Sequence, residues 1–334
     1  MTRSSEHPAS VQTRSETAAR DIRTTGIALA AVTAVISGFS VFVNGYGVGH
    51  FDDSTTYTTA KNLVAAVVIT AVFLGQRRHP RRGLERHLAA VPAAPTHPAI
   101  GERRRVASLI AIAVIGGSIP FVLFFEGLAR VSSSDAAFIH KTLVAWVAVL
   151  GVVVLRERVA VPHLAAVALI LIGYAGMAGG IGFPEVGDGE LLILAATLCW
   201  SVEVVIARSL LRCGVPALTV STWRMGGGIV LLIGWAFARG AIDDLVGLSA
   251  AQWWWVLLTG LFLSAYVLTW HQALARAQAV DVTAVLATGA VLTAMLDTGV
   301  RGAAIEPVGV TLLLVGGLIV AVTDLVAPRR PARP

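Results

Sequence analysis

The chain has 334 residues, of which 56% are hydrophobic and only 14% are charged, and its mean hydropathy is +0.76. A soluble globular domain carries about 25% charged residues, so this composition excludes a chain built to be surrounded by water and indicates one polytopic membrane domain. The net charge of +6 does not indicate nucleic-acid binding, because the basic residues form short runs between apolar segments rather than one face or stripe.

Ten apolar segments are long enough to cross about 30 Å of hydrocarbon as helices. Their apolar runs are continuous, whereas the strands of a membrane barrel would alternate polar and apolar residues. The polar residues before the first segment predict a disordered tail, 1–25. The ten predicted segments span 26–44, 54–74, 106–126, 135–155, 162–181, 190–208, 217–238, 252–271, 281–299 and 306–325.

Basic residues gather on one side of the predicted membrane. If the N-terminus is cytoplasmic, 20 basic residues lie inside and 3 lie outside, while "FDDS", "PEVGDGE" and "IDDL" place acid outside. This asymmetry predicts a multi-pass protein of the cell membrane with both termini, including tail 326–334, in the cytoplasm. The Arg-, Pro- and His-rich segment 75–105 is predicted to be a flexible cytoplasmic loop lying against anionic lipid.

An internal repeat divides the chain into two halves. The stretch "LARVSSSDAAF" at 128–138 matches "LARAQAVDVTA" at 274–284, and "AAVTAVISG" at 30–38 resembles "LAATLCWSV" at 194–202. Lys61 in "TTAKNLV" falls where Arg224 stands in "STWRMGG". The halves, 26–181 and 190–325, hold five helices each, and an odd number inverts the second half relative to the first. The predicted fold is therefore all-α, with ten transmembrane helices as two inverted five-helix repeats and a binding site near the midplane.

Residues 125–178, "FEGLARVSSSDAAFIHKTLVAWVAVLGVVVLRERVAVPHLAAVALILIGYAGMA", resemble the third to fifth helices of the EamA-like branch of the drug/metabolite transporter superfamily. The likeness covers nearly all of the chain after residue 25, and Glu157 and Arg158 stand at that family's Glu-Arg loop. It implies ten helices, cytoplasmic termini and movement of small metabolites, often outward. The fourth helix lacks the family's early proline, and "LDTGVRGAAIEPVG" replaces a second Glu-Arg loop. These departures remove any inference of a known substrate.

Lys141 and His140 stand inside the fourth predicted helix. Lys141 lies ~9 Å along that helix from its predicted start at residue 135. Three interpretations of this lysine remain open. Its ammonium snorkels to the headgroups, it faces the cavity and binds an anionic group of the substrate, or it forms an ion pair with Glu126 or Asp135. His140 points about 100° away, so the two side chains are not expected to share one ligand.

Glu203 and Arg224 lie at equal depth, roughly 8–10 Å from the same face, on consecutive helices. Equal depth predicts a structural ion pair, because each charge alone is costly; the alternative makes Glu203 a proton- or cation-coupling carboxylate. Trp200 shares a helix face with Glu203. His271 is predicted at the cytoplasmic end of the eighth helix, as a gate residue or an interface anchor. The candidate residues of the substrate site are Lys141, His140, Trp146, Trp200, Glu203, Trp270 and His271.

The remaining polar residues receive structural interpretations. Lys61 is interpreted as bracing or snorkelling, and Asp135 and Asp281 as N-caps of their helices. Glu157, with Arg156 and Arg158, is interpreted as a clamp within its loop. Cys199 and Cys213 offer neither a disulfide framework nor a metal set, so we expect no metal and no cofactor.

The favoured function is a secondary transporter that moves a small polar metabolite, such as an amino acid, by alternating access, with export favoured. The expected partners are that substrate and the lipid bilayer, with no nucleic acid, and the chain is expected to be a monomer or homodimer. The alternatives are a lipid flippase or an accessory membrane subunit. An integral-membrane enzyme is less favoured, because the chain lacks H-E-x-x-H and G-x-G-D motifs.

Overall fold

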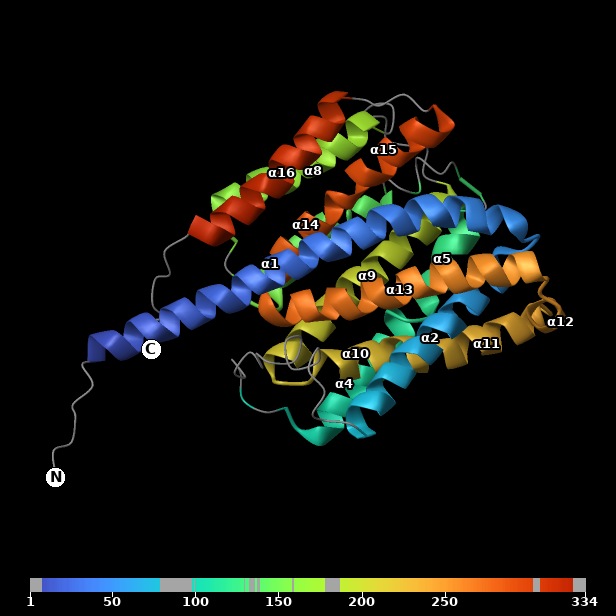
Figure 1. Cartoon of the computed structure of the whole chain (residues 1–334), viewed down its shortest axis with the longest axis horizontal. Helices are drawn as coiled ribbons and strands as arrows, with labels where there is room; N and C mark the ends of the chain where they lie inside the picture. Colours follow the sequence, from blue (N-terminus) through green and yellow to red (C-terminus); the bar gives the residue numbers. More distant parts are fainter. Residues whose placement is uncertain are drawn as a thin grey trace.

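The computed structural model describes residues 8–78, 98, 100–128, 130–131, 136, 139–157, 159–177, 187–302 and 307–326, and these form a bundle of helices (Figure 1). The first half contains α1 (Pro8–Gly47), α2 (Ser54–Arg78), α4 (Glu102–Ile115), α5 (Ile119–Leu128), α7 (Leu143–Val153) and α8 (Val161–Met177). The second half contains α9 (Asp188–Arg212), α10 (Ala217–Thr222), the π-helical turn η2 (Trp223–Gly227), α11 (Gly228–Ala238), α12 (Ile242–Val246), α13 (Ala250–Arg276), α14 (Ala279–Ala287), α15 (Gly289–Arg301) and α16 (Pro307–Val326).

Seven helical stretches within the described residues are long and apolar enough to cross a membrane. Three further apolar helices, Ile139–Val153, Val161–Gly176 and Pro307–Thr323, are shorter than that criterion requires. Each of the ten predicted segments coincides with one of these stretches. The seven long stretches are Arg20–His50, Ser54–Arg78, Glu102–Leu128, Asp188–Arg212, Ala217–Ala238, Ala250–Arg276 and Ala279–Val300.

The helices of one half pack against those of the other in reciprocal pairs. The first helix of the first half, α1, packs along α13, and the first helix of the second half, α9, packs along α5, which belongs to the matching third segment. Likewise α2 packs against α13, while η2 packs against α4, and the last helices of the halves, α8 and α16, pack on each other. Figure 1 shows α8 and α16 side by side. The repeat read from sequence is thus a repeat in space.

The third and seventh segments are interrupted where they meet. Helix α4 ends at Ile115, and the turn Gly116–Ser118 separates it from α5, whose first turn contains Pro120, a residue without a backbone N–H. A Cβ on Gly117 would collide with the carbonyl oxygen of Arg224, and one on Gly228 would collide with the backbone of Gly117. Only glycine permits this approach, so the turn and the π-helical segment are fitted to each other.

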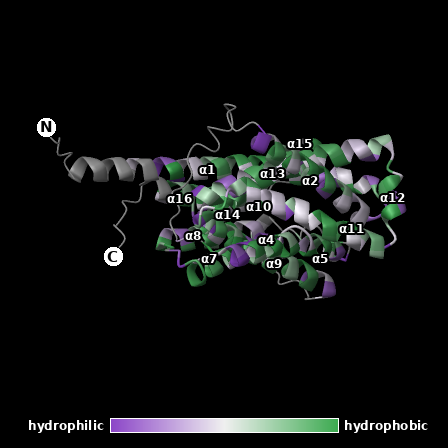
Figure 2. Ribbon diagram, turned by 90° about the horizontal axis from the view of Figure 1, so that it is seen from below, coloured by the Kyte–Doolittle hydropathy of each residue, from purple (hydrophilic) through white to green (hydrophobic). Residues whose placement is uncertain are grey.

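The exterior of the bundle is apolar. Valine, leucine and isoleucine side chains on α2, α7, α11 and α16 are exposed in the chain alone, for example Val67, Val153, Val230 and Leu318. Figure 2 shows hydrophobic residues along most of the helices. An exposed apolar surface of this kind fits contact with lipid chains rather than with water.

Helix α1 begins at Pro8, which corrects the expectation of a disordered tail over 1–25 for residues 8–25. The segment contains alanines and other good helix formers, "SETAAR", so it extends the apolar helix without needing apolar residues of its own. Residues 1–7, the 79–97 part of the predicted loop and the tail from 327 lie outside the described residues.

Candidate substrate site

Glu203 and Arg224 lie together inside the bundle. Glu203 stands on α9 and Arg224 on η2, and Arg224 Nη1 lies 3.8 Å from Glu203 Oε2. The side chains are 1% and 7% exposed, so neither charge can be stabilised by bulk water. Burial of both partners makes the pair dependent on close contact, because an isolated charge at this depth is costly.

His271 on α13 joins this pair. Its Nε2 lies 3.4 Å from Glu203 Oε1, and its Nδ1 lies 2.8 Å from the hydroxyl of Ser221 on α10. The helix continues five residues beyond His271 to Arg276, and the imidazole is fully buried. His271 was predicted at the end of its helix, as a gate residue or an interface anchor, and this position is wrong. The helix continues through the polar residues Gln272 and Arg276. We call Glu203, Arg224, His271 and Ser221 the buried cluster.

The glycine turn between α4 and α5 forms one wall of the buried cluster. The carbonyl oxygen of Gly116 accepts hydrogen bonds from Arg224 Nε at 3.4 Å and from Trp200 Nε1 at 3.2 Å. A Cβ at Gly116 would meet the Glu203 side chain. The interrupted helix thus presents a backbone carbonyl to the cation, which is how broken membrane helices commonly contribute to polar sites.

Trp200 and His140 extend the site with an aromatic wall. The two rings are 5.0 Å apart in an edge-to-face arrangement, and Phe124 on α5 packs 5.4 Å from His140 and 5.8 Å from Trp200. His140 Nδ1 is buried without a hydrogen-bond partner among the described residues. Of the sequence candidates, His140, Trp200, Glu203 and His271 therefore lie in one continuous group.

Lys141 points to a different part of the bundle from His140. Its ammonium lies 5.7 Å from the centre of the Tyr174 ring on α8, and the Tyr174 hydroxyl donates to the carbonyl oxygen of Ala287 at 2.6 Å. The predicted partner Glu126 lies instead within 3.6 Å of Arg130 and of Arg239, while Asp135 lies outside the described residues. Lys141 thus stands where the fourth and ninth segments meet the fifth.

The two other tryptophan candidates make their described contacts with residues that do not belong to the buried cluster. Trp146 is 38% exposed on α7, and its indole nitrogen donates to the hydroxyl of Thr142. Trp270 is buried and stacks on Tyr266 with 6.0 Å between ring centres. Trp146 therefore points outward from α7, whereas Trp270 is buried and stacks on a residue of its own helix, α13.

A second buried polar group, missed from the sequence, lies where α13 passes into α14. Asp281 is fully buried, with His163 Nε2 at 3.1 Å and Arg23 Nη2 at 3.7 Å. This corrects its interpretation as an N-cap, since Gln278 holds that position. The isolated His163 and Asp281 within apolar segments were the available signal, because a lone buried polar group needs a partner.

Glu157 joins the halves beside Asp281. It accepts hydrogen bonds from Arg208 Nε at 3.2 Å and from the backbone nitrogen of Ala279 at 3.1 Å. These contacts correct the expected clamp with Arg156 and Arg158, of which Arg158 lies outside the described residues. Burial raises the pKa of Glu157, with the neighbouring Arg208 acting in the opposite direction.

Described residues line a small and a larger hollow. One, of about 10 Å³, is lined by α2, α5 and α11 and is large enough for a single water. The other, of about 560 Å³, opens between the start of α4 and the ends of α7 and α9, with Arg104 and Arg212 in its walls. Among the described residues, no three His, Cys, Asp or Glu side chains are grouped so as to hold a metal ion, and Cys199 and Cys213 are free thiols.

The sequence matches the EamA-like transporter family over residues 24–179 and 188–323, once for each half. The chain belongs to this family, within the drug/metabolite transporter superfamily. It is 23% identical over 252 residues to the uncharacterized transporter YyaM of Bacillus subtilis (strain 168). The aligned region covers 72% of this chain and 76% of YyaM. One crystal structure shares the fold, with a TM-score of 0.64 and 17% identity, over 92% of this chain and 98% of its own. This is a multi-pass membrane protein of the transporter class, and family and relative point to transport rather than enzymatic activity.

Proposed function

We propose that this EamA-like protein is a secondary transporter in the cell membrane that exports a small polar organic metabolite by alternating access. In this proposal residues 26–181 and 190–325 form two inverted five-helix repeats with ten membrane crossings and cytoplasmic termini, as the charge distribution favours. The chain contains no Walker motif, so nucleotide hydrolysis within the chain is not the proposed energy source.

The observation that carries the proposal is the buried cluster at the interrupted helices. Glu203, Arg224 and His271 come from three consecutive segments of one half, and the turn at Gly116 that closes the site comes from the other half. A charged group between two halves that rock against each other would change its surroundings during transport. Glu203 offers a carboxylate to a substrate ammonium, and the Trp200 and His140 rings offer it an aromatic surface.

The small residues between the halves support a rocking motion. Gly38 on α1 and Gly289 on α15 each lie against backbone of the other helix, as do Gly127 on α5 and Gly189 on α9. Helices that meet through small residues pack closely without interlocking side chains. In the proposed cycle these contacts let one repeat rotate against the other around the buried cluster.

Counterflow in proteoliposomes tests the proposal. Purified protein is reconstituted into liposomes that are preloaded with candidate amino acids and related metabolites. Exchange of radiolabelled solute is then measured, and translocation of labelled phospholipid is measured in parallel. We expect one polar metabolite to exchange, and Glu203→Gln and Lys141→Ala to slow that exchange. Translocation of lipid without exchange of any metabolite would replace the proposal with a lipid flippase.

A further inference from the structure

The buried cluster has a counterpart in the first half of the chain. Lys61 and Thr58 stand 163 residues before Arg224 and Ser221, in the matching stretches "TTAKNLV" and "STWRMGG". Phe39 stands 164 residues before Glu203, at the offset that relates the first helices of the two halves. The counterpart therefore keeps the cation and the hydroxyl, while the sequence position of the acid is taken by Phe39, which is exposed on the outside of the bundle.

The fourth member of the buried cluster is replaced as well. Phe125 stands 146 residues before His271, at the offset that relates "LARVSSSDAAF" to "LARAQAVDVTA". In the structure the Lys61 ammonium lies 5.0 Å from the centre of the Phe125 ring. The sequence offsets thus correspond to a real neighbourhood, formed by α2 and α5 in the first half and by α10, η2 and α13 in the second.

Lys61 is a buried cation with no counter-ion among the described residues. Its side chain is 7% exposed, and no carboxylate of a described residue lies within 4 Å of its ammonium. Its polar contact is Asn44 Oδ1 at 3.0 Å, an oxygen that also accepts from the Tyr57 hydroxyl at 2.6 Å. An ammonium has three hydrogens to donate, so this one shared amide oxygen leaves most of its capacity unused.

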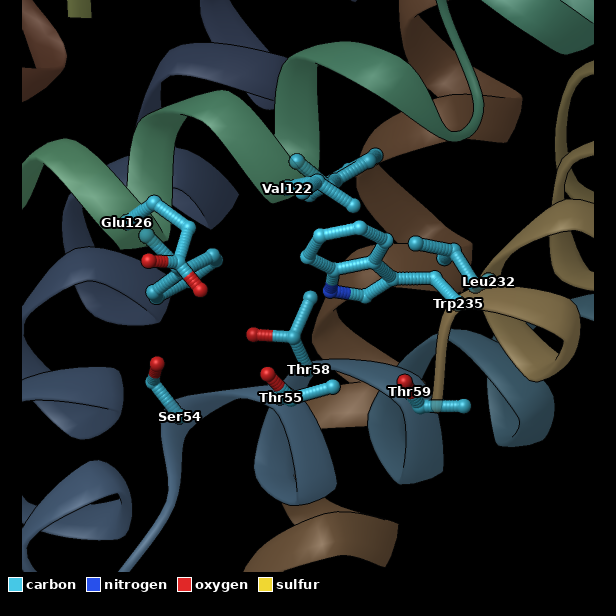
Figure 3. A pocket seen from close by; sticks show the side chains of 10 residues that line it. Ser54, Thr55, Thr58, Thr59, Val122, Glu126, Leu232 and Trp235 are labelled. Atoms are coloured by element: carbon cyan, nitrogen blue, oxygen red, sulfur yellow. The ribbon is translucent and has the colours of Figure 1, made fainter. Parts of the chain in front are cut away.

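The part of α2 next to Lys61 carries hydroxyl groups that make no hydrogen bond among the described residues. The side-chain oxygens of Thr58 and Thr59 are buried and have no hydrogen-bond partner among the described residues. Both threonines line the smaller hollow, together with Phe125. Figure 3 shows the Thr58 side chain on the wall of this hollow, beneath the indole of Trp235. The Phe125 ring lines this hollow and also lies against the Lys61 ammonium.

We propose that Lys61 and Thr58 bind an oxyanion of the transported substrate, either a carboxylate or a phosphate, in the place that Glu203 fills in the second half. This assignment rests on the proposed transport function and narrows its substrate class to solutes with an anionic group. The present hollow holds about one water, so binding moves the Phe125 ring aside. A charge-assisted hydrogen bond to the ammonium then replaces its contact with the ring.

Anion binding by the purified full chain in lipid nanodiscs tests this inference. Acetate and inorganic phosphate are titrated separately at constant ionic strength against chloride, with thermal unfolding and tryptophan fluorescence as readouts. We expect one of them to bind, Lys61→Met to raise its apparent dissociation constant at least tenfold, and Thr58→Val to raise it several-fold. The matched control Arg77→Met removes another cation of α2 that lies over an aromatic ring, that of Phe73, and should change the constant less than twofold.

Absence of binding by the wild type, or unchanged binding by Lys61→Met, would overturn the inference, and so would an equal loss in Arg77→Met. If Lys61→Met does not fold, Thr58→Val and the charge-retaining Lys61→Arg decide: we expect weaker binding in the first and retained binding in the second, and the opposite result overturns the inference. Metabolite counterflow without anion binding would reject this site while leaving the transport proposal intact.

Discussion

Thr142 and Thr288 occupy equivalent tight turns in the two halves, and three of their hydrogen bonds to backbone groups match. Each hydroxyl donates to the carbonyl oxygen three residues earlier, at 2.6 Å in Thr142 and 2.7 Å in Thr288. The backbone nitrogen of each threonine also donates to that same carbonyl at 3.1 Å. The carbonyl oxygen of each threonine accepts from the backbone nitrogen three residues later, at 2.9 Å in Thr142 and 3.0 Å in Thr288. The residues are 146 positions apart, so the repeat extends to a local change of helical geometry.

We expect Thr288→Val to lower the free energy of unfolding by about 0.5–1.5 kcal/mol, the usual net value of one hydrogen bond. Thr142→Val should lower it by at least as much, because the Thr142 hydroxyl also accepts a hydrogen bond from Trp146 Nε1. The control is Thr311→Val on α16, which removes a similar bond at an exposed position and should have a smaller effect. Chemical unfolding in detergent measures all three. Equal losses in all variants would show that the two turns have no special structural role.

Substitution of Gly117 should disrupt the contact between the third and seventh segments. A Cβ there would collide with the carbonyl oxygen of Arg224, whereas one on Gly234 of α11 meets nothing within 4 Å. We expect Gly117→Ala to destabilise the protein by about 1–3 kcal/mol, and Gly234→Ala to be neutral or stabilising by up to about 1 kcal/mol. Thermal unfolding of the two variants checks this, and equal stability would contradict the close approach.

Glu203 and Arg224 should show strong coupling in a double-mutant cycle. Glu203→Gln or Arg224→Met alone leaves one uncompensated buried charge and is expected to cost about 3–5 kcal/mol. The double variant removes both charges and should be more stable than the sum of the single effects predicts. Unfolding free energies of the four proteins measure the coupling, and simple additivity would mean that the pair does not interact.

Glu157 should make stability depend on pH. Its pKa is raised above the ordinary value of 4.5 by burial, so the folded state holds the proton more tightly than the unfolded state does. Its contribution is fully present below pH 4.5 and is lost as the pH rises through the raised pKa. We therefore expect the wild type to lose stability relative to Glu157→Gln as the pH increases from 4 towards neutrality. A stability difference that stays constant over this range would contradict the assignment.

The sequence predicted the features that follow from hydropathy, charge and repetition. Continuous apolar runs predicted ten segments, and seven of them coincide with helical stretches long and apolar enough to cross a membrane. Glu203 and Arg224 were predicted at equal depth on consecutive helices, and in the structure Arg224 Nη1 lies 3.8 Å from Glu203 Oε2. Depth along a helix is calculable because the rise per residue is constant. It gives no information on the direction in which a side chain points.

The direction of side chains explains the failures. A soluble helix shows its buried face by an apolar stripe, but in a membrane both lipid and core favour apolar residues, so that signal disappears. Trp146 and Trp200 were therefore equivalent from the sequence, although one is 38% exposed and the other 9%. The contact of Asp281 with Arg23 was equally hidden, because Arg23 lies in a segment that its polarity suggested was disordered.

The most direct test of the proposed substrate site compares two tryptophans that the sequence could not distinguish. Counterflow of the identified substrate is measured in proteoliposomes containing wild type, Trp200→Phe or Trp146→Phe at equal protein content. Trp200 borders the buried cluster through Gly116 and His140, whereas Trp146 faces outward. We predict at least a tenfold loss of exchange for Trp200→Phe and less than a twofold change for Trp146→Phe. Normal exchange by Trp200→Phe, or an equal loss in Trp146→Phe, would contradict a substrate site at the buried cluster.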